Sequence, residues 1–253
     1  MAWATITSLK IVTHYVRFEG TSSISNYMFK LKLYLLFLII FLLILGGVTQ
    51  RHALACEFIE YSKYSEIAPD VFVSASFDIN EKENLLSTID SAKSRISSTF
   101  GMMTSNPKAV VVANKNEASN FGANLFGRAF LTPMGQCIIL GPNGQNIDVI
   151  AHEYTHAEFH HRVGWLKYML DVPIWFNEGI ALLVDFRKPY LLENINLSQE
   201  EINAVKKTKF DFSVKSYQAA RASVEHISKA KLYENLEKIK QGQDIENVFM
   251  SEN

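Results

Sequence analysis

The chain has 253 residues, of which 48% are hydrophobic and 20% are charged. This is enough material for one sizeable globular domain and an appendage. The formal net charge is -1, which gives no electrostatic case for a nucleic-acid partner.

The appendage is an apolar run from Leu33 to Val48 near the N-terminus. Its length falls between the core of about 7 to 15 residues in a signal peptide and the roughly 20 residues that span a membrane. Ala53-Leu54-Ala55 follows as an A-x-A signal-peptidase site. We therefore expect residues 1–55 to form a leader, either a cleaved signal peptide or a retained membrane anchor, ahead of a folded domain over residues 56–253.

Positive charges before the apolar run predict its orientation. Lys30 and Lys32 precede it directly, and Arg17 and Lys10 lie further back. Such flanks stay on the cytoplasmic side, so the folded domain is expected to be exported or anchored on the non-cytoplasmic face of the cell membrane. Met28 would open a compact, positively charged n-region, which leaves open whether translation starts there or at Met1.

The two cysteines, Cys56 and Cys137, are consistent with export. They can pair in an oxidising compartment, but Cys137 lies in an apolar run and is more often a small buried hydrophobic residue. Cys56 directly follows the A-x-A site, which raises lipoprotein processing as a third fate of the leader. Ala53 argues against it, since it stands where such a site prefers leucine.

The first half of the folded domain predicts a small mixed sheet with two helices. Asp78 and Glu81 have capping-box spacing ahead of a helix that ends at Gly101, and Thr132-Pro-Met-Gly135 is typical of a hairpin turn. The expected strands are Val71–Phe77, Ala109–Ala113, Phe126–Leu131 and Gln136–Leu140, and Lys115–Phe121 is a second, short helix.

His152-Glu153-Tyr154-Thr155-His156 is an H-E-x-x-H pentapeptide in a stretch, Ile147 to Arg162, that predicts a helix with Asp148 capping or stabilising its start. Residues i and i+4 lie on one helical face, so His152 and His156 can bind one metal ion. Glu153 points elsewhere, but it can reach a water at the metal and take its proton. This is the arrangement of a zinc hydrolase.

A catalytic zinc usually has three protein ligands, and Glu178 is the best candidate for the third. The chain has room to turn through Val163 to Val172 and to return on a second helix that begins near Pro173. Gly179 would let the two helices approach closely around the ion. A third histidine ligand would need the pattern H-E-x-x-H-x-x-G-x-x-H, which this sequence lacks. His160 and His161 are therefore expected at the surface or behind the ligands.

The stretches Ile147–His156 and Pro173–Ala181 resemble the gluzincin clan of metallopeptidases, the thermolysin-like group with an H-E-x-x-H helix and a downstream glutamate ligand. The compact peptidase MA-like domains, with an N-E-G-x-A second helix, look closest, and the resemblance covers about Gly135 to Phe186. It implies a zincin-like fold, a Zn2+ ion held by His152, His156 and Glu178, and Glu153 as the base.

Beyond Glu178 we expect helices. Ser198 and Glu201 have capping-box spacing, and the expected helices run from Ser198 to Lys207, Tyr217 to Ser228, Leu232 to Lys240 and Ile245 to Met250. The sequence as a whole therefore predicts an α+β fold, in which a small mixed sheet lobe precedes a mainly helical lobe and an N-terminal hydrophobic helix precedes both.

Amide hydrolysis also needs a donor for the developing oxyanion. The segment around Tyr217 resembles the helix after the metal site in MA-like domains, where a tyrosine faces the zinc, so Tyr217 is our candidate, with His226 and Arg221 as alternatives. Tyr217 could equally pack against the core. Asp185 can orient a ligand histidine or cap a helix end.

We therefore expect an exported or membrane-anchored zinc metallopeptidase over residues 56–253, acting on peptide or protein substrates. Gly122-Ala-Asn-Leu125 lacks the glutamate by which aminopeptidases of this clan hold a free amine, which favours an endopeptidase. The strand Gln136–Leu140, just before the metal helix, is the candidate edge for backbone pairing with substrate, unless it is an interior strand. The alternative function is a non-catalytic peptide-binding or chaperone-like module on a zincin fold.

Overall fold

The computed structural model describes residues 21–250, and the chain divides into two compact units, Met1–Gln50 and Arg51–Asn253. Lys10, Arg17 and a start at Met1 lie outside the described residues. The boundary falls a few residues before the expected one at residue 55, because the segment that carries the A-x-A site is helical and Ala53 is buried.

The first unit contains helix α1 (Thr21–Thr49). Within it, the 20-residue stretch Met28–Gly47 is long and apolar enough to cross a membrane. The expected N-terminal apolar helix is therefore confirmed, although a signal sequence has the same length and composition.

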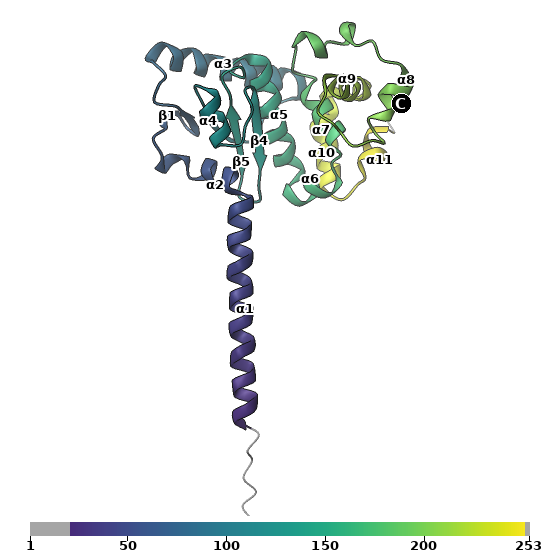
Figure 1. The fold of residues 1–253 in the computed structure, drawn as a ribbon. Coiled ribbons are helices and arrows are strands. Elements are labelled where there is room, and N and C mark those ends of the chain that lie inside the picture. Colours follow the sequence, from purple (N-terminus) through teal and green to yellow (C-terminus); the bar gives the residue numbers. More distant parts are fainter. Residues whose placement is uncertain (1–20, 251–253) are drawn as a thin grey trace, which may run out of the picture. The chain divides into compact units, whose positions relative to one another are not determined.

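In the second unit, the described strands form one five-stranded sheet in the order β1-β2-β3-β5-β4 (Figure 1). The three inner strands run parallel, and each edge strand pairs antiparallel with its neighbour, so the predicted mixed sheet is confirmed. The strands are β1 (Ser65–Ala68), β2 (Val71–Val73), β3 (Lys108–Val111), β4 (Gly127–Leu131) and β5 (Gln136–Leu140).

Two strand predictions need correction. β1 was not predicted, because its short sequence is polar and partly exposed. The strand expected over Val71–Phe77 ends at Val73, since the backbone N–H of Phe77 donates to the carbonyl of Ser74 in a turn toward the next helix.

β5 lies between β3 and β4, so both of its backbone edges are already paired. The expectation that Gln136–Leu140 is a free edge for substrate is therefore wrong. Its residues Cys137 to Leu140 are all buried, as is typical of an interior strand. The sheet edge beside the metal helix is β4 instead.

The helices of the sheet lobe agree closely with the sequence. The Asp78–Glu81 capping box opens α3 (Ile79–Phe100), and Gly101 ends it with a φ of 105°. Asn114 caps α4 (Lys115–Asn120). α2 (Arg51–Glu57) and the short 3₁₀ turn η1 (Ile59–Tyr61) come before the sheet.

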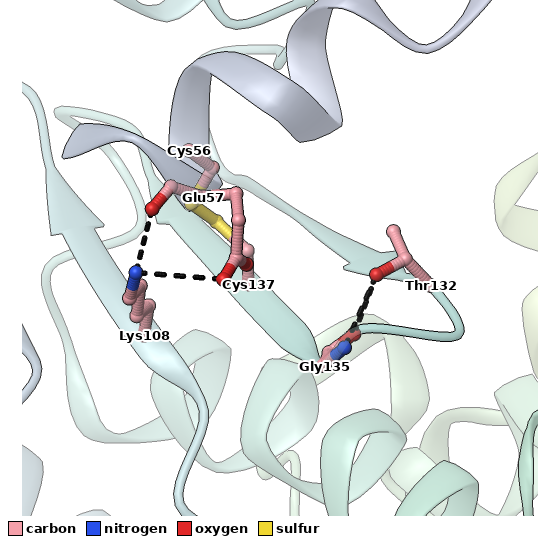
Figure 2. The surroundings of a disulfide bond; sticks show 6 residues. All are labelled: Cys56, Glu57, Lys108, Thr132, Gly135 and Cys137. Carbon is pink, nitrogen blue, oxygen red and sulfur yellow. Dashed lines mark hydrogen bonds and ion pairs between the residues drawn. A yellow bond between two sulfur atoms is a disulfide. The ribbon is translucent and has the colours of Figure 1, made fainter. Parts of the chain in front are cut away.

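Cys56 of α2 and Cys137 of β5 form a disulfide (Figure 2). The sequence left this pairing open, and it forms because the position of β5 in the sheet brings Cys137, which is also buried as expected, beside α2. The Nζ atom of Lys108 also donates to the carbonyl of Glu57 at 2.6 Å. The disulfide and this hydrogen bond hold α2 against the sheet.

The remainder of the second unit is helical, as predicted. α5 packs against the sheet on one side and against α7 and α10 on the other (Figure 1). The helices are α5 (Ile147–Val163), α6 (Trp165–Asp171), α7 (Ile174–Ala181), α8 (Gln199–Ala204), α9 (Val214–Ser223), α10 (Leu232–Lys240) and α11 (Ile245–Met250), with 3₁₀ turns η2 (Lys188–Tyr190), η3 (Leu192–Asn194) and η4 (Lys229–Lys231).

Three helix boundaries differ from the prediction. The segment Val163–Val172 was expected to be a turn, but it contains α6. α8 is shorter than expected although its Ser198–Glu201 capping box is present. α9 begins before Tyr217, because Ser213 accepts a hydrogen bond from the backbone N–H of Ser216 and caps the helix.

Candidate metal centre

Helix α5 presents the H-E-x-x-H residues from the centre of the fold. Asn146, rather than Asp148, is the N-cap: its side chain accepts from the backbone N–H of Val149 at 3.1 Å. Asp148 lies in the first turn and pairs with Arg95 of α3, so it stabilises the helix start from outside.

Three ligand atoms converge at one point between α5 and α7. The two Nε2 atoms of His152 and His156 are 3.1 Å apart. Oε2 of Glu178 lies 3.3 Å from the Nε2 atom of His152 and 3.5 Å from that of His156. Ligands bonded to a tetrahedral zinc at about 2.0–2.1 Å should lie about 3.3 Å from one another. This spacing fits a metal ion, and the three residues form a group that could hold one.

Glu153 is buried beside these residues, in the same cleft. The carboxylate of Glu153 lies against Gly127 of strand β4. A Cβ atom added at Gly127 would lie only 3.0 Å from Oε1 of Glu153, so a side chain at this position would crowd the carboxylate. Burial raises the pKa of Glu153, an effect that the nearby His152 and His156 partly offset. A raised pKa suits a carboxylate that must accept and return a proton.

Asp185 lies behind His152. Its Oδ2 atom is 3.4 Å from Nδ1 of His152, on the side of the ring away from the candidate metal position. Arg187 makes an ion pair with the same carboxylate. Asp185 therefore has the position of an orienting partner for His152, which is one of the two roles considered from the sequence. The other role, capping the helix end, does not describe it, because α7 ends at Ala181 and Leu182 is its C-cap.

The electrostatics of this cluster favour a positive charge at its centre. Burial alone lowers the pKa of His152, but hydrogen bonding to Asp185 and Glu178 outweighs burial and raises this pKa to about 10. Burial raises the pKa of Glu178, but the two histidines outweigh it and hold this pKa well below its usual range. A cation between these groups, either a proton or a metal ion, is therefore stabilised.

The three candidate ligands and Glu153 line a cleft of about 530 Å³. Tyr217 of α9 lines the same cleft, and burial raises its pKa above the usual range. Tyr168 of α6 also lines it, with its hydroxyl beside Asn177. Sequence reasoning missed Tyr168 because α6 was taken for a turn. The spacing of the apolar and aromatic residues over 165–171 was the sequence signal that could have predicted this helix.

The alternative oxyanion donors lie elsewhere. Arg221 makes an ion pair with Glu225. His226 lines a separate cavity of about 410 Å³ together with Trp175 and Phe210.

The two histidines after the motif differ from each other. His161 is exposed. His160 is buried, its Nδ1 atom lies 3.0 Å from Nε2 of Gln136, and its ring contacts Tyr168.

Gly179 permits a close helix contact, but not the expected one. A Cβ atom at this position would lie 2.5 Å from the carbonyl oxygen of Ala220, so the glycine allows α7 to approach α9 rather than α5. The contact places Tyr217 of α9 over the same cleft as Glu178 of α7.

Comparison with known proteins adds nothing to this geometry: no family model, curated protein or solved structure matches the chain.

Proposed function

We propose that this protein is a zinc-dependent endopeptidase of the gluzincin type, with a zincin-like domain that holds Zn2+ through His152, His156 and Glu178. The observation that carries the proposal is the spacing of the three ligand atoms, 3.1 to 3.5 Å apart, with Glu153 in the same cleft. Two neutral imidazoles and one carboxylate suit zinc, and three protein ligands leave its fourth position open for water and substrate.

Each residue of the site has a separate role in the proposed hydrolysis. Zinc, when bound, supplies a Lewis acid that polarises the attacked carbonyl and makes water more acidic. Glu153 takes the proton from the attacking water and returns it to the leaving amine. Tyr217 donates its phenolic hydrogen to the oxyanion that develops on the carbonyl, and Tyr168 approaches the same space from α6.

In this proposal, an extended substrate binds along strand β4. This strand pairs only with β5 among the described strands, so its other edge has no strand partner, although the backbone N–H of Gly127 donates to Oδ1 of Asn124. Gly127, Arg128 and Ala129 of this strand line the cleft beside Glu153. Backbone pairing holds a peptide without reading much of its sequence.

The charged residues that line the cleft favour cleavage of internal peptide bonds over cleavage at a chain terminus. Its lining acids are Glu153 and Glu178, both already assigned, and Gly122–Asn124 adds no charge. Among the described lining residues, no carboxylate is left to hold a free amino terminus. This supports the endopeptidase proposal.

The proposed location is the non-cytoplasmic side of the cell membrane, or outside the cell. A disulfide between Cys56 and Cys137 suits an oxidising compartment. Ala53 of the A-x-A site is buried in α2, so cleavage there must precede the folding of α2, and a chain that folds first keeps its anchor.

The test is zinc content and peptide hydrolysis of the purified full chain, with three variants. The parent should bind close to one zinc per chain and hydrolyse a mixed unstructured protein substrate. Glu178→Ala should lose most of the metal, while Glu193→Ala, an exposed glutamate of the same lobe, should keep metal and activity. Glu153→Gln should keep the metal and lose turnover.

Two outcomes would contradict the proposal. A zinc-free parent after metal reloading would mean that the cluster is not a metal site. A zinc-bound parent that binds peptides but does not cleave them, indistinguishable from Glu153→Gln, would favour the non-catalytic peptide-binding module.

A further inference from the structure

Helix α6 (Trp165–Asp171) has no buried residue although it is rich in large apolar side chains. Trp165 is 39% exposed, Leu166 60%, Met169 59% and Leu170 73%. Their spacing places them on one side of the helix. A contiguous apolar patch of this kind marks an interaction site, whereas single exposed apolar residues do not.

The other side of α6 is firmly packed. The ring of Tyr168 contacts those of Phe159 and His160 on α5. The helix therefore cannot turn its apolar side inward without removing Tyr168 from the candidate site. The exposure of this side is a fixed property of the folded unit.

A chain of contacts connects α6 to α2, where the folded unit begins. Cys56 of α2 is bonded to Cys137 of β5. The preceding residue, Gln136, lies 3.0 Å from Nδ1 of His160, whose ring contacts Tyr168. Within the second unit, α2 and α6 both lie at its lower edge in Figure 1.

We call the four exposed apolar residues of α6, Trp165, Leu166, Met169 and Leu170, the apolar seat.

The chain itself indicates what covers this surface. The candidate span ends at Gly47, and the folded unit begins at Arg51. Even fully extended, that short connection reaches only on the order of 14 Å. If the span is retained, the first residue of α2 therefore stays within that reach of the end of the span.

We propose that the apolar seat inserts into the surface of the lipid bilayer in which the N-terminal helix is anchored. Trp165 suits the headgroup level, and the leucine and methionine side chains suit the boundary of the acyl chains. Lys167, the one cation of α6, is already paired with Asp171. The contact is therefore apolar and does not need anionic lipid. The inference rests on the retained anchor and is independent of the proposed catalysis.

The test places a nitroxide spin label on the full chain in vesicles of zwitterionic phosphatidylcholine. Leu170→Cys carries the label in the seat, and Ile79→Cys, 67% exposed at the start of α3, is the matched control. Both positions are exposed, so neither label disturbs the core. The measurement compares quenching by oxygen, which concentrates in lipid, with quenching by a water-soluble nickel chelate.

The label at residue 170 should show an oxygen-to-nickel accessibility ratio several-fold above that at residue 79. Equal ratios would overturn the proposal. Exclusion of both reagents at residue 170 would mean that protein, such as a second copy of the chain, covers the seat, and this would overturn it as well. So would a chain recovered from its host with its N-terminus at Cys56, because the anchor would then be absent.

Discussion

Gly127 of β4 lies directly against the carboxylate of Glu153: a Cβ atom at residue 127 would be 3.0 Å from Oε1 and 3.1 Å from Cγ. The edge strand proposed to hold the substrate and the base proposed to activate water are thus in contact. The absence of a side chain at residue 127 determines where the carboxylate can lie.

Gly127→Ala should therefore displace Glu153 and lower kcat by about 10- to 100-fold, because small displacements of a reacting group are costly. Zinc content should not change, since the residue does not contact the ligands. Gly135→Ala is the control, as no atom lies within 4 Å of an added Cβ there. An unchanged kcat in Gly127→Ala would show that Glu153 can shift without cost.

Asp185→Asn should lower zinc affinity by about 10- to 100-fold, the usual effect of removing a partner behind a ligand histidine. The amide cannot supply the negative charge that faces Nδ1 of His152 at 3.4 Å. Competition with a chelator measures the affinity, and Asp171→Asn, at an exposed position, is the control. Equal zinc affinities of the parent and Asp185→Asn would show that Asp185 interacts with Arg187 but does not orient His152.

Tyr217→Phe should lower kcat by about 100-fold or more and leave zinc bound, because it removes one donor to the oxyanion. Tyr168→Phe should have a smaller effect, since its hydroxyl lies beside Asn177. Tyr190→Phe is the control, as Tyr190 contacts the ring of Tyr217 at 5.7 Å between centroids. A larger loss of kcat in Tyr168→Phe than in Tyr217→Phe would indicate that Tyr168, rather than Tyr217, is the main donor to the oxyanion.

Glu158→Gln should destabilise the fold near neutral pH by about 1–3 kcal/mol, since the buried carboxylate accepts hydrogen bonds from Thr104, Ser105 and Arg162. Burial raises the pKa of Glu158, but these bonds outweigh burial and hold it below its ordinary value of 4.5. Its contribution is therefore complete above pH 4.5 and is lost as the pH falls through the folded-state pKa.

Urea unfolding at several pH values measures this effect. The difference between the parent and Glu158→Gln should shrink in acid. Glu234→Gln, an exposed glutamate that pairs with Lys238, should behave as the parent throughout. A pH-independent difference would show that Glu158 acts through packing rather than charge.

Local patterns made much of the site predictable. The spacing of His152 and His156 on a helix places two imidazoles on one face, and the segment after Pro173 needs only to return as a helix to bring Glu178 to them. Capping boxes at Asp78 and Ser198 likewise mark helix starts from side chains a few residues apart.

The errors, and the cysteine pairing that the sequence left open, concern contacts between distant segments. The position of β5 inside the sheet depends on its partners β3 and β4, which its own residues do not specify. The disulfide of Cys137 and the contact of Gly179 with α9 are also set by tertiary packing. α6 was missed because Val163–Val172 was interpreted only as the turn between the two helices of the metal site.

The burial of Ala53 makes the fate of the leader a matter of timing. Signal peptidase acts on an extended chain, and Ala53 becomes inaccessible once α2 is packed and Cys56 is bonded to Cys137. If the chain is exported, cleavage and folding therefore compete. For an exported chain, we therefore expect that a molecule in which the disulfide closes first keeps its leader, and that a more oxidising compartment holds a larger share of anchored protein.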